Sequence, residues 1–165
     1  LNNSKYGYDT NDNVMRISLL RSPKAPDAEA DMGNHSIEYS LYPHAADWRK
    51  AQTPRRGLEF NTPLVAVVEN QHKGTLPASA SYYSAGPDNV ILSVVKRAED
   101  SDADVLRLYE ATGKDSKATI MLPAKAKKVQ IVNLMEEEPV NVKADGAKIV
   151  VPIGHYEILT LKVEY

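Results

Sequence analysis

The 165-residue chain is long enough for one domain or two small ones, and its 20 basic and 22 acidic residues give a formal net charge of −2. A charge this close to zero creates no field that would attract nucleic acid or an anionic membrane, so we predict neither partner. The absence of cysteine excludes disulfides and thiolate metal sites and favours a reducing compartment, so we expect a cytoplasmic protein. No apolar run has the length that crosses a bilayer.

Alternation of apolar and polar residues predicts strands early in the chain. Residues 15–19 and 37–41 both alternate with the period of a sheet that has one wet face, so we expect half-buried strands there. Residues 22–27 contain two prolines and are predicted to be a stiff, extended link. One short helix is predicted over residues 45–55, where Pro54 would disrupt it near its end.

The rest of the chain predicts short, closely spaced strands. They cover residues 64–68, 79–83, 90–95, 105–109, 118–122, 128–132, 140–142, 149–151 and 157–163. Residues 90–95 and 149–151 are apolar on nearly every position, which is typical of strands between packed layers. Asp145-Gly146 predicts a hairpin turn between residues 140–142 and 149–151, because glycine supplies the positive φ of a tight turn.

Many short strands without intervening long helices predict an all-β fold. We expect an antiparallel β-sandwich, or two small packed sandwich units, with one short helix. The turn sequence Gly86-Pro87-Asp88-Asn89 predicts a sub-boundary near residues 86–89.

The residues alone predict no complete active site. The four histidines are scattered and lack the HExxH spacing that places two imidazoles on one helical face for zinc. Residues 100–104 begin like a calcium loop, but Val105 occupies the position that needs glycine. Asp27, Glu29 and Asp31 form an acidic series that is more typical of surface charge than of a catalytic pair.

Several segments combine residues that are uncommon in generic strands and turns. The chain opens with Leu-Asn-Asn-Ser-Lys-Tyr-Gly-Tyr-Asp, and residues 17–27 read Ile-Ser-Leu-Leu-Arg-Ser-Pro-Lys-Ala-Pro-Asp. With residues 29–35, 39–44 and 47–49, these segments resemble the C-terminal region of α-mannosidases of glycoside hydrolase family 38. A weaker likeness continues through residues 106–111, 133–137 and 156–161, so the resemblance spans nearly the whole chain.

The resemblance implies the tail of a longer enzyme. Such an enzyme would be a retaining α-mannosidase that removes terminal α-mannosyl residues, with its nucleophile, its acid and a zinc-type divalent metal in an N-terminal barrel. No position of this chain matches those catalytic or metal motifs, so we expect no metal in the chain itself. The implied partners are an α-mannoside or oligosaccharide substrate and the enzyme's own N-terminal catalytic domain, and a homo-oligomer is left open.

The opening motif supplies the candidate substrate-binding residues. In the family this loop approaches the sugar pocket, so the resemblance implies substrate contacts from Asn3, Lys5, Tyr6 and Gly7. Amide and ammonium groups can hydrogen-bond sugar hydroxyls, an aromatic face can cover a pyranose, and glycine allows close approach. Asn3 stands where an aspartate is usual, which removes a negative charge there. The alternative is a turn into a strand, in which Tyr6 and Tyr8 only pack.

A second hypothesis belongs to a different functional class. Because sandwiches host many functions, the chain could be a free-standing module that binds carbohydrate or another protein. Sugar binding by the isolated chain that is lost when one exposed aromatic is removed would favour this alternative.

Overall fold

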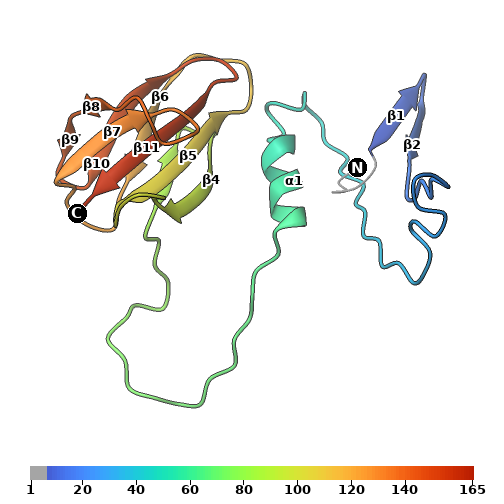
Figure 1. Cartoon of the computed structure of the whole chain (residues 1–165), viewed down its shortest axis with the longest axis horizontal. Helices are drawn as coiled ribbons and strands as arrows, with labels where there is room; N and C mark the ends of the chain where they lie inside the picture. Colours follow the sequence, from blue (N-terminus) through green and yellow to red (C-terminus); the bar gives the residue numbers. More distant parts are fainter. Residues whose placement is uncertain (1–6) are drawn as a thin grey trace. The chain divides into compact units, whose positions relative to one another are not determined.

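The computed structural model describes residues 7–165 and divides into two compact units, Leu1–Val67 and Val68–Tyr165. The described part of the first unit contains a two-stranded hairpin and one helix, whereas the second contains two β-sheets (Figure 1). The predicted β-sandwich therefore forms from the second unit alone. Among residues 7–165, the only helix is too short to cross a membrane.

The hairpin of the first unit pairs β1 (Tyr8–Asn11) with β2 (Val14–Ile17) in antiparallel register. A two-residue loop connects them, and its first residue, Asp12, has a φ of 50°. An ion pair of 2.7 Å joins Arg16 to Asp9 across the strands. The strand predicted at residues 15–19 is therefore present, but it is not half-buried, because Met15 remains 55% exposed.

The helix, α1 (Thr53–Asn61), begins where the predicted helix over residues 45–55 should have ended. Pro54 occupies the first turn, where a missing N–H needs no partner, so this proline starts the helix and does not disrupt it. Gln52, directly before the helix, has a left-handed backbone with a φ of 53°. That conformation separates the helix from the turns over residues 48–52.

Three of the predicted strands do not form. Residues 37–41 contain only an isolated bridge at Ser40, and residues 64–68 and 79–83 have no strand pairing in the part of the chain that is described. Leu64 and Val65 are almost fully exposed. A strand pattern becomes a strand only when a neighbouring strand supplies hydrogen-bonding partners along its length, and none of the strands of residues 7–165 pairs with these segments in that way.

The second unit consists of two antiparallel sheets. The four-stranded sheet has the order β3 (Ser84–Gly86), β6 (Ser116–Met121), β10 (Lys148–Ile153) and β9 (Ala144–Asp145). The five-stranded sheet has the order β4 (Val90–Arg97), β5 (Asp104–Glu110), β11 (Ile158–Glu164), β7 (Lys128–Val132) and β8 (Val140–Val142). The predicted all-β antiparallel fold is therefore confirmed. Gly86 ends β3, and residues 87–89 connect it to β4 within this unit.

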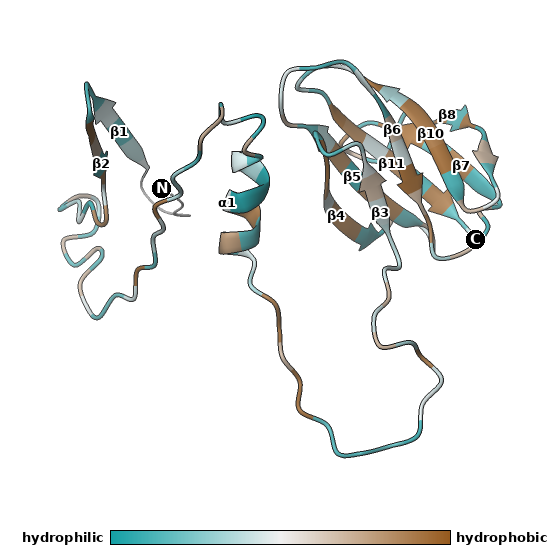
Figure 2. Cartoon of the chain, turned by 180° about the vertical axis from the view of Figure 1, so that it is seen from behind, coloured by the Kyte–Doolittle hydropathy of each residue, from teal (hydrophilic) through white to brown (hydrophobic). Residues whose placement is uncertain are grey.

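The hydrophobic core lies between the inner faces of the two sheets. Figure 2 shows the hydrophobic colour concentrated on the strands of the sandwich, among them β6 and β10. The core residues include Ala118, Ile120, Ile149, Val151 and Ile153 from the four-stranded sheet and Leu106, Leu108, Leu159, Leu161 and Val163 from the five-stranded sheet. Alternate residues of the strands point inward, as in two packed sheets, although part of the outer face of the five-stranded sheet is also buried, at Val105, Val132 and Thr160.

The two apolar runs do not lie between packed layers as predicted. In β10, Ile149 and Val151 are buried, but Val150 between them is 47% exposed. In β4, Val90 and Ile91 are buried, whereas Val95 is 46% exposed beyond a bulge between Leu92 and Val94. The sandwich has only two layers, so each strand has one outer face whatever its sequence.

The turn at Asp145-Gly146 forms, but it joins different strands from those predicted. The loop Gly146-Ala147 connects β9 to β10, where Asp145 pairs with Lys148. The strand β8 pairs instead with β7 in the other sheet. Lys143 alone separates β8 from β9, so the chain crosses from one sheet to the other at this residue.

Replacing Gly146 by alanine should lower the free energy of unfolding by about 1 to 2 kcal/mol, because its φ of +61° disfavours any residue with a Cβ. Urea denaturation measures the change. Gly86→Ala is the matched control, since Gly86 has no positive φ and open space around its Cβ position. Equal effects from the two substitutions would contradict a conformational role for Gly146.

Candidate functional site

The opening motif is only partly described. Asn3, Lys5 and Tyr6 lie outside the described residues, and Gly7 is the first residue that the structure describes. Gly7 has a φ of +91°, and its carbonyl accepts a hydrogen bond of 3.1 Å from the Ser18 N–H. This bond closes the hairpin of β1 and β2, so Gly7 has a backbone role at the start of the hairpin. The substrate contacts of all four residues stay a prediction.

Tyr8, the first residue of β1, bears on the alternative interpretation of the motif, in which Tyr6 and Tyr8 only pack. Its side chain is 46% exposed, and it lies opposite Ile17 in the hairpin. Tyr8 is therefore only half covered and is not a core residue.

The histidines make separate interactions. His35 Nε2 lies 2.7 Å from the Asp31 carbonyl, His44 Nδ1 lies 2.5 Å from the Ala46 carbonyl, and His155 Nδ1 lies 2.7 Å from Asp115 Oδ1. Among residues 7–165, no three histidine, aspartate or glutamate side chains gather in a way that could hold a metal ion. The described part of the chain therefore does not fit the divalent metal that the resemblance implies for the parent enzyme.

The acidic series at residues 27–31 acts on the local backbone. Asp27 Oδ1 accepts a 2.9 Å hydrogen bond from the Glu29 N–H, and Asp31 Oδ2 accepts one of 3.1 Å from the Ser22 N–H. Hydrogen bonds that nearby N–H groups donate to aspartate side chains stabilise turns. These interactions fit the surface interpretation of the series.

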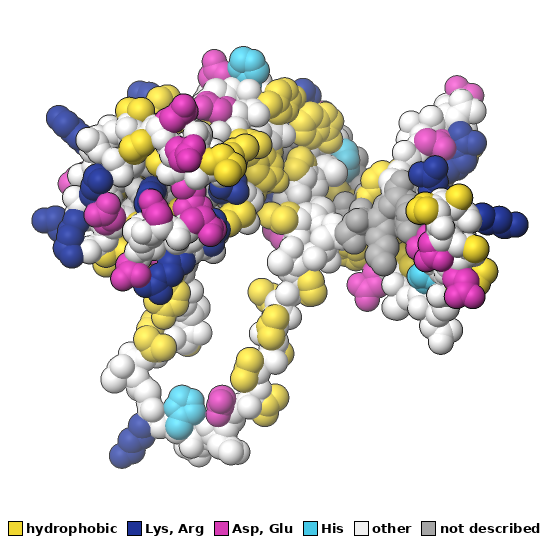
Figure 3. Space-filling view, in the orientation of Figure 1, with side chains coloured by type: hydrophobic (Ala, Val, Ile, Leu, Met, Phe, Trp, Pro, Cys, Tyr) yellow, Lys and Arg dark blue, Asp and Glu magenta, His cyan; other side chains and the backbone are white. Residues whose placement is uncertain are grey.

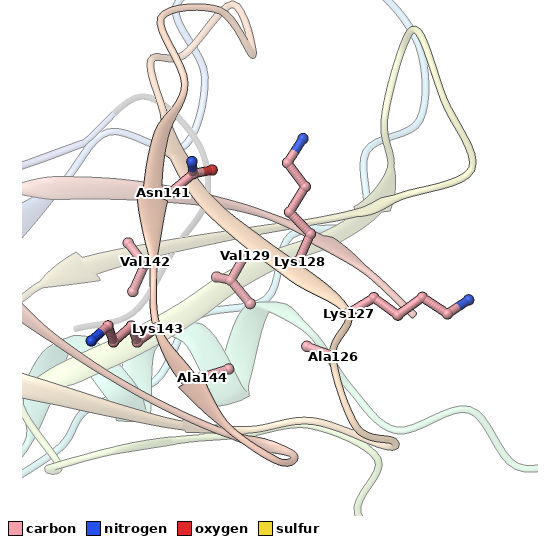
Figure 4. A pocket seen from close by; sticks show the side chains of 8 residues that line it. All are labelled: Ala126, Lys127, Lys128, Val129, Asn141, Val142, Lys143 and Ala144. Atoms are coloured by element: carbon pink, nitrogen blue, oxygen red, sulfur yellow. The ribbon is translucent and has the colours of Figure 1, made fainter.

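An open groove of about 430 Å³ lies where β7 faces the crossing from β8 to β9 (Figure 4). Its lining residues are Ala126, Lys127, Lys128, Val129, Asn141, Val142, Lys143 and Ala144. The three lysine side chains point in different directions, so they do not converge on one anion. No carboxylate lines the groove, and glycoside hydrolysis requires two carboxyl groups across the sugar.

Glu110, at the end of β5, is only 2% exposed, and its carboxylate accepts six hydrogen bonds. Its Oε1 accepts hydrogen bonds from Asn89 Nδ2 at 2.8 Å and from the N–H and hydroxyl of Thr112 at 2.8 and 2.6 Å. Its Oε2 accepts from the N–H groups of Gly113, Lys114 and Tyr156 at 2.7, 3.1 and 3.1 Å.

The environment of Glu110 determines its protonation. Burial raises the pKa of the carboxyl group, but the hydrogen bonds from Thr112, Asn89 and the Tyr156 N–H outweigh burial and hold the pKa far below its ordinary value. A permanently ionised carboxylate with every lone pair engaged cannot transfer a proton near neutral pH. Glu110 therefore joins the loop after β5 to the loop before β11, and its role is structural.

A second, partly buried polar cluster includes the C-terminal residue, Tyr165. The Tyr83 hydroxyl donates to Asp104 and lies 3.2 Å from the Tyr165 hydroxyl. Burial and these neighbours raise the pKa of Tyr83, and burial raises that of Tyr165, so both phenols stay protonated at neutral pH. Neither this cluster nor the Glu110 network was predicted from the sequence.

Comparisons with known families fit the two-sheet architecture. A profile described as "Glycosyl hydrolases family 38 C-terminal beta sandwich domain" matches residues 89–161, which contain β4 to β8, β9, β10 and most of β11. A second, "Glycosyl hydrolases family 38 C-terminal domain", matches residues 1–29. The fold and these matches define the C-terminal β-sandwich region of a glycosidase.

Similar proteins of known function narrow the class of glycosidase to the α-mannosidases. The chain is 37% identical over 150 residues to the α-mannosidase of Saccharomyces cerevisiae and 31% identical over 166 residues to α-mannosidase G of Dictyostelium discoideum, covering 82% and 98% of this chain. It is also 36% identical over 141 residues to α-mannosidase 2C1 of Mus musculus, covering 83% of this chain. The chain belongs to glycoside hydrolase family 38 and corresponds to its C-terminal region. It spans only 13–15% of the length of these relatives.

Proposed function

We propose that this chain is the C-terminal region of a retaining α-mannosidase that removes terminal α-mannosyl residues from an α-mannoside or oligosaccharide. The observation that carries the proposal is the identity of 31–37% to α-mannosidases over 82–98% of this chain. The region braces a catalytic barrel that lies elsewhere in the polypeptide. The substrate and the activity belong to that longer enzyme.

The described structure supports a bracing role more than a catalytic one. The sandwich has a continuous apolar core, its buried carboxylate Glu110 is fully occupied by hydrogen bonds, and its groove contains no acid. We therefore assign the nucleophile, the acid and the zinc or other divalent metal to the catalytic domain. The absence of cysteine is the basis for proposing a cytoplasmic enzyme.

The opening loop is the one part of the chain that we propose to reach the sugar pocket. Asn3, Lys5, Tyr6 and Gly7 carry suitable hydrogen-bonding and stacking chemistry, and Gly7 directly precedes the hairpin of β1 and β2. The loop would contact the sugar or its leaving group without taking part in bond cleavage.

In the full-length enzyme, Lys5→Ala or Tyr6→Ala should lower kcat/KM for an aryl α-mannoside by about tenfold or more, since one lost transition-state contact is worth roughly 1.4 kcal/mol. The melting temperature should barely change. Lys24→Ala and Tyr39→Ala are matched controls, because both residues are exposed and lie outside the opening motif. Variants of Lys5 or Tyr6 that melt early but keep kcat/KM would show that the loop only packs.

A further inference from the structure

The loop between β7 and β8 exposes two adjacent hydrophobic side chains. Leu134 is 56% exposed and Met135 is 75% exposed. Exposed apolar side chains usually occur singly and need no explanation. This pair is unusual because the loop that carries it is fixed by several hydrogen bonds.

One hydrogen bond joins the loop to the sandwich, and two more fix the turn within the loop. Arg107 of β5 donates from Nη2 to the Leu134 carbonyl at 3.2 Å. Asn133 Oδ1 accepts from the N–H groups of Met135 and Glu137 at 2.9 and 3.0 Å. These bonds hold the backbone on each side of the exposed pair.

The side chain of Glu136 adds a second anchor and is only 6% exposed. Its Oε1 pairs with Lys96 Nζ at 2.7 Å, and its Oε2 accepts from the Glu99 N–H at 2.9 Å. The hydrogen bond from Lys96 lowers the pKa of Glu136, so the pair stays charged at neutral pH. A loop held this firmly loses little further conformational freedom when a partner covers it, which favours binding.

The exposed pair lies on the outer face of the five-stranded sheet. Arg107 also reaches Thr160 of β11, with 3.3 Å between Nε and Oγ1, so both side chains belong to the face opposite the core residues Leu159 and Leu161. Ile158 shares that face by the alternation of β11, and it is 56% exposed. Figure 3 shows hydrophobic side chains exposed among charged ones on the surface of the sandwich.

We propose that the outer face formed by Leu134, Met135 and Ile158 is the surface on which the rest of the α-mannosidase polypeptide docks. The inference rests on the proposed function. The chain spans 13–15% of its relatives, so in an enzyme of that length more than four fifths of the polypeptide is available to cover this face. The charged groups beside the face have polar partners, which limits the cost of removing them from water. Lys96 pairs with Glu99 and Glu136. Arg107 donates to Thr160 and to the Leu134 carbonyl.

Oxidation of methionine by dilute hydrogen peroxide in the full-length enzyme tests the proposal. In the structure Met135 is 75% exposed and Met121, on the outer face of the other sheet, is 43% exposed, so a free sandwich would oxidise Met135 faster. Docking reverses the order, and we expect Met135 to react about fivefold more slowly than Met121. Mass spectrometry of tryptic peptides gives both rates from one sample.

A substitution supplies the second arm of the test. Leu134→Asp should speed the oxidation of Met135 in the full-length enzyme. Burying a carboxylate in the apolar contact is costly, so the substitution weakens the docking and exposes Met135 to peroxide. Val150→Asp is the matched control on the outer face of the other sheet, and it should leave the rate unchanged.

Each outcome separates the docking surface from the enzyme's activity. Faster oxidation of Met135 than of Met121 in an active α-mannosidase would overturn the inference and leave the proposed function intact. Protection of Met135 that disappears on dilution would assign the face to a second copy and would also overturn it. Protection that persists on dilution in a protein without α-mannosidase activity would support the docking and overturn the function.

Discussion

Replacing Glu110 by alanine should lower the free energy of unfolding by about 3 kcal/mol or more at pH 7, because it removes the shared acceptor of six donors around a buried carboxylate. Four of those donors are backbone N–H groups, from Thr112, Gly113, Lys114 and Tyr156. Urea denaturation of the chain followed by circular dichroism measures the loss.

Glu110→Gln tests the charge while nearly keeping the shape. The amide replaces one acceptor oxygen by a donor that faces other donors, so we expect a loss of roughly 2 kcal/mol. Glu164→Gln is the matched control, because Glu164 pairs with Lys128 at 3.5 Å and both side chains are about half exposed. Such a pair contributes at most about 1 kcal/mol.

The stability contributed by Glu110 should depend on pH. Its pKa is lowered in the folded state, so the contribution is fully present above the ordinary carboxyl pKa of 4.5 and is lost as the pH falls below it. Asp100, Asp115 and Glu136 have lowered pKa values too, but they are unchanged in the Gln variant. The difference between wild type and Glu110→Gln should therefore begin to shrink near pH 5 and should keep shrinking as the pH falls below the ordinary carboxyl pKa of 4.5 towards the lowered pKa of the folded state. A constant difference would contradict an ionised Glu110.

The sandwich could be predicted from the sequence because its strands alternate and lie close together along the chain. In β10, buried Ile149, Val151 and Ile153 alternate with exposed residues, and the neighbouring strands supply the hydrogen-bonding partners. Residues 37–41 alternate equally well but form no strand. Alternation reports a preference for extended structure, whereas a sheet also needs a partner, which a local pattern does not contain.

The errors at α1 and at β8 have a common cause. The sequence predicts that Pro54 ends a helix, but Pro54 occupies the first turn of one. The sequence also predicts that the turn at Gly146 follows residues 140–142, but it follows β9. In both cases the sequence correctly predicts a helix boundary or a turn at that residue, but it does not predict which segment lies on the other side of it. A single residue, Lys143, is enough to move the chain to the other sheet.

The Glu110 network could not be predicted, because its members come from separate parts of the chain. The sequence at Asn89 and at residues 112–114 indicates only turns, and Tyr156 lies 46 residues after Glu110 in the chain. A glutamate at the end of an apolar strand is the one local signal, since a charge at a core position requires partners. The predicted substrate contacts of Asn3, Lys5 and Tyr6 rest on resemblance to the family and await the kinetic test.

The isolated 165-residue chain should hydrolyse an aryl α-mannoside no faster than buffer, whereas the full-length enzyme should accelerate the reaction on the order of a millionfold or more. Glycoside hydrolysis needs a nucleophile or base and an acid across the sugar. Glu110 is ionised and fully bonded, and the groove beside β7 presents lysines without a carboxylate. Release of the coloured aglycone, followed over a range of chain concentrations, makes the comparison.

Folding must be established for an inactive result to carry weight. A circular dichroism spectrum dominated by β-structure, with a cooperative thermal transition, would show that the sandwich is intact in the sample. Turnover that rises in proportion to the chain concentration, together with one tightly bound metal ion per chain, would mean that the chain holds its own active site.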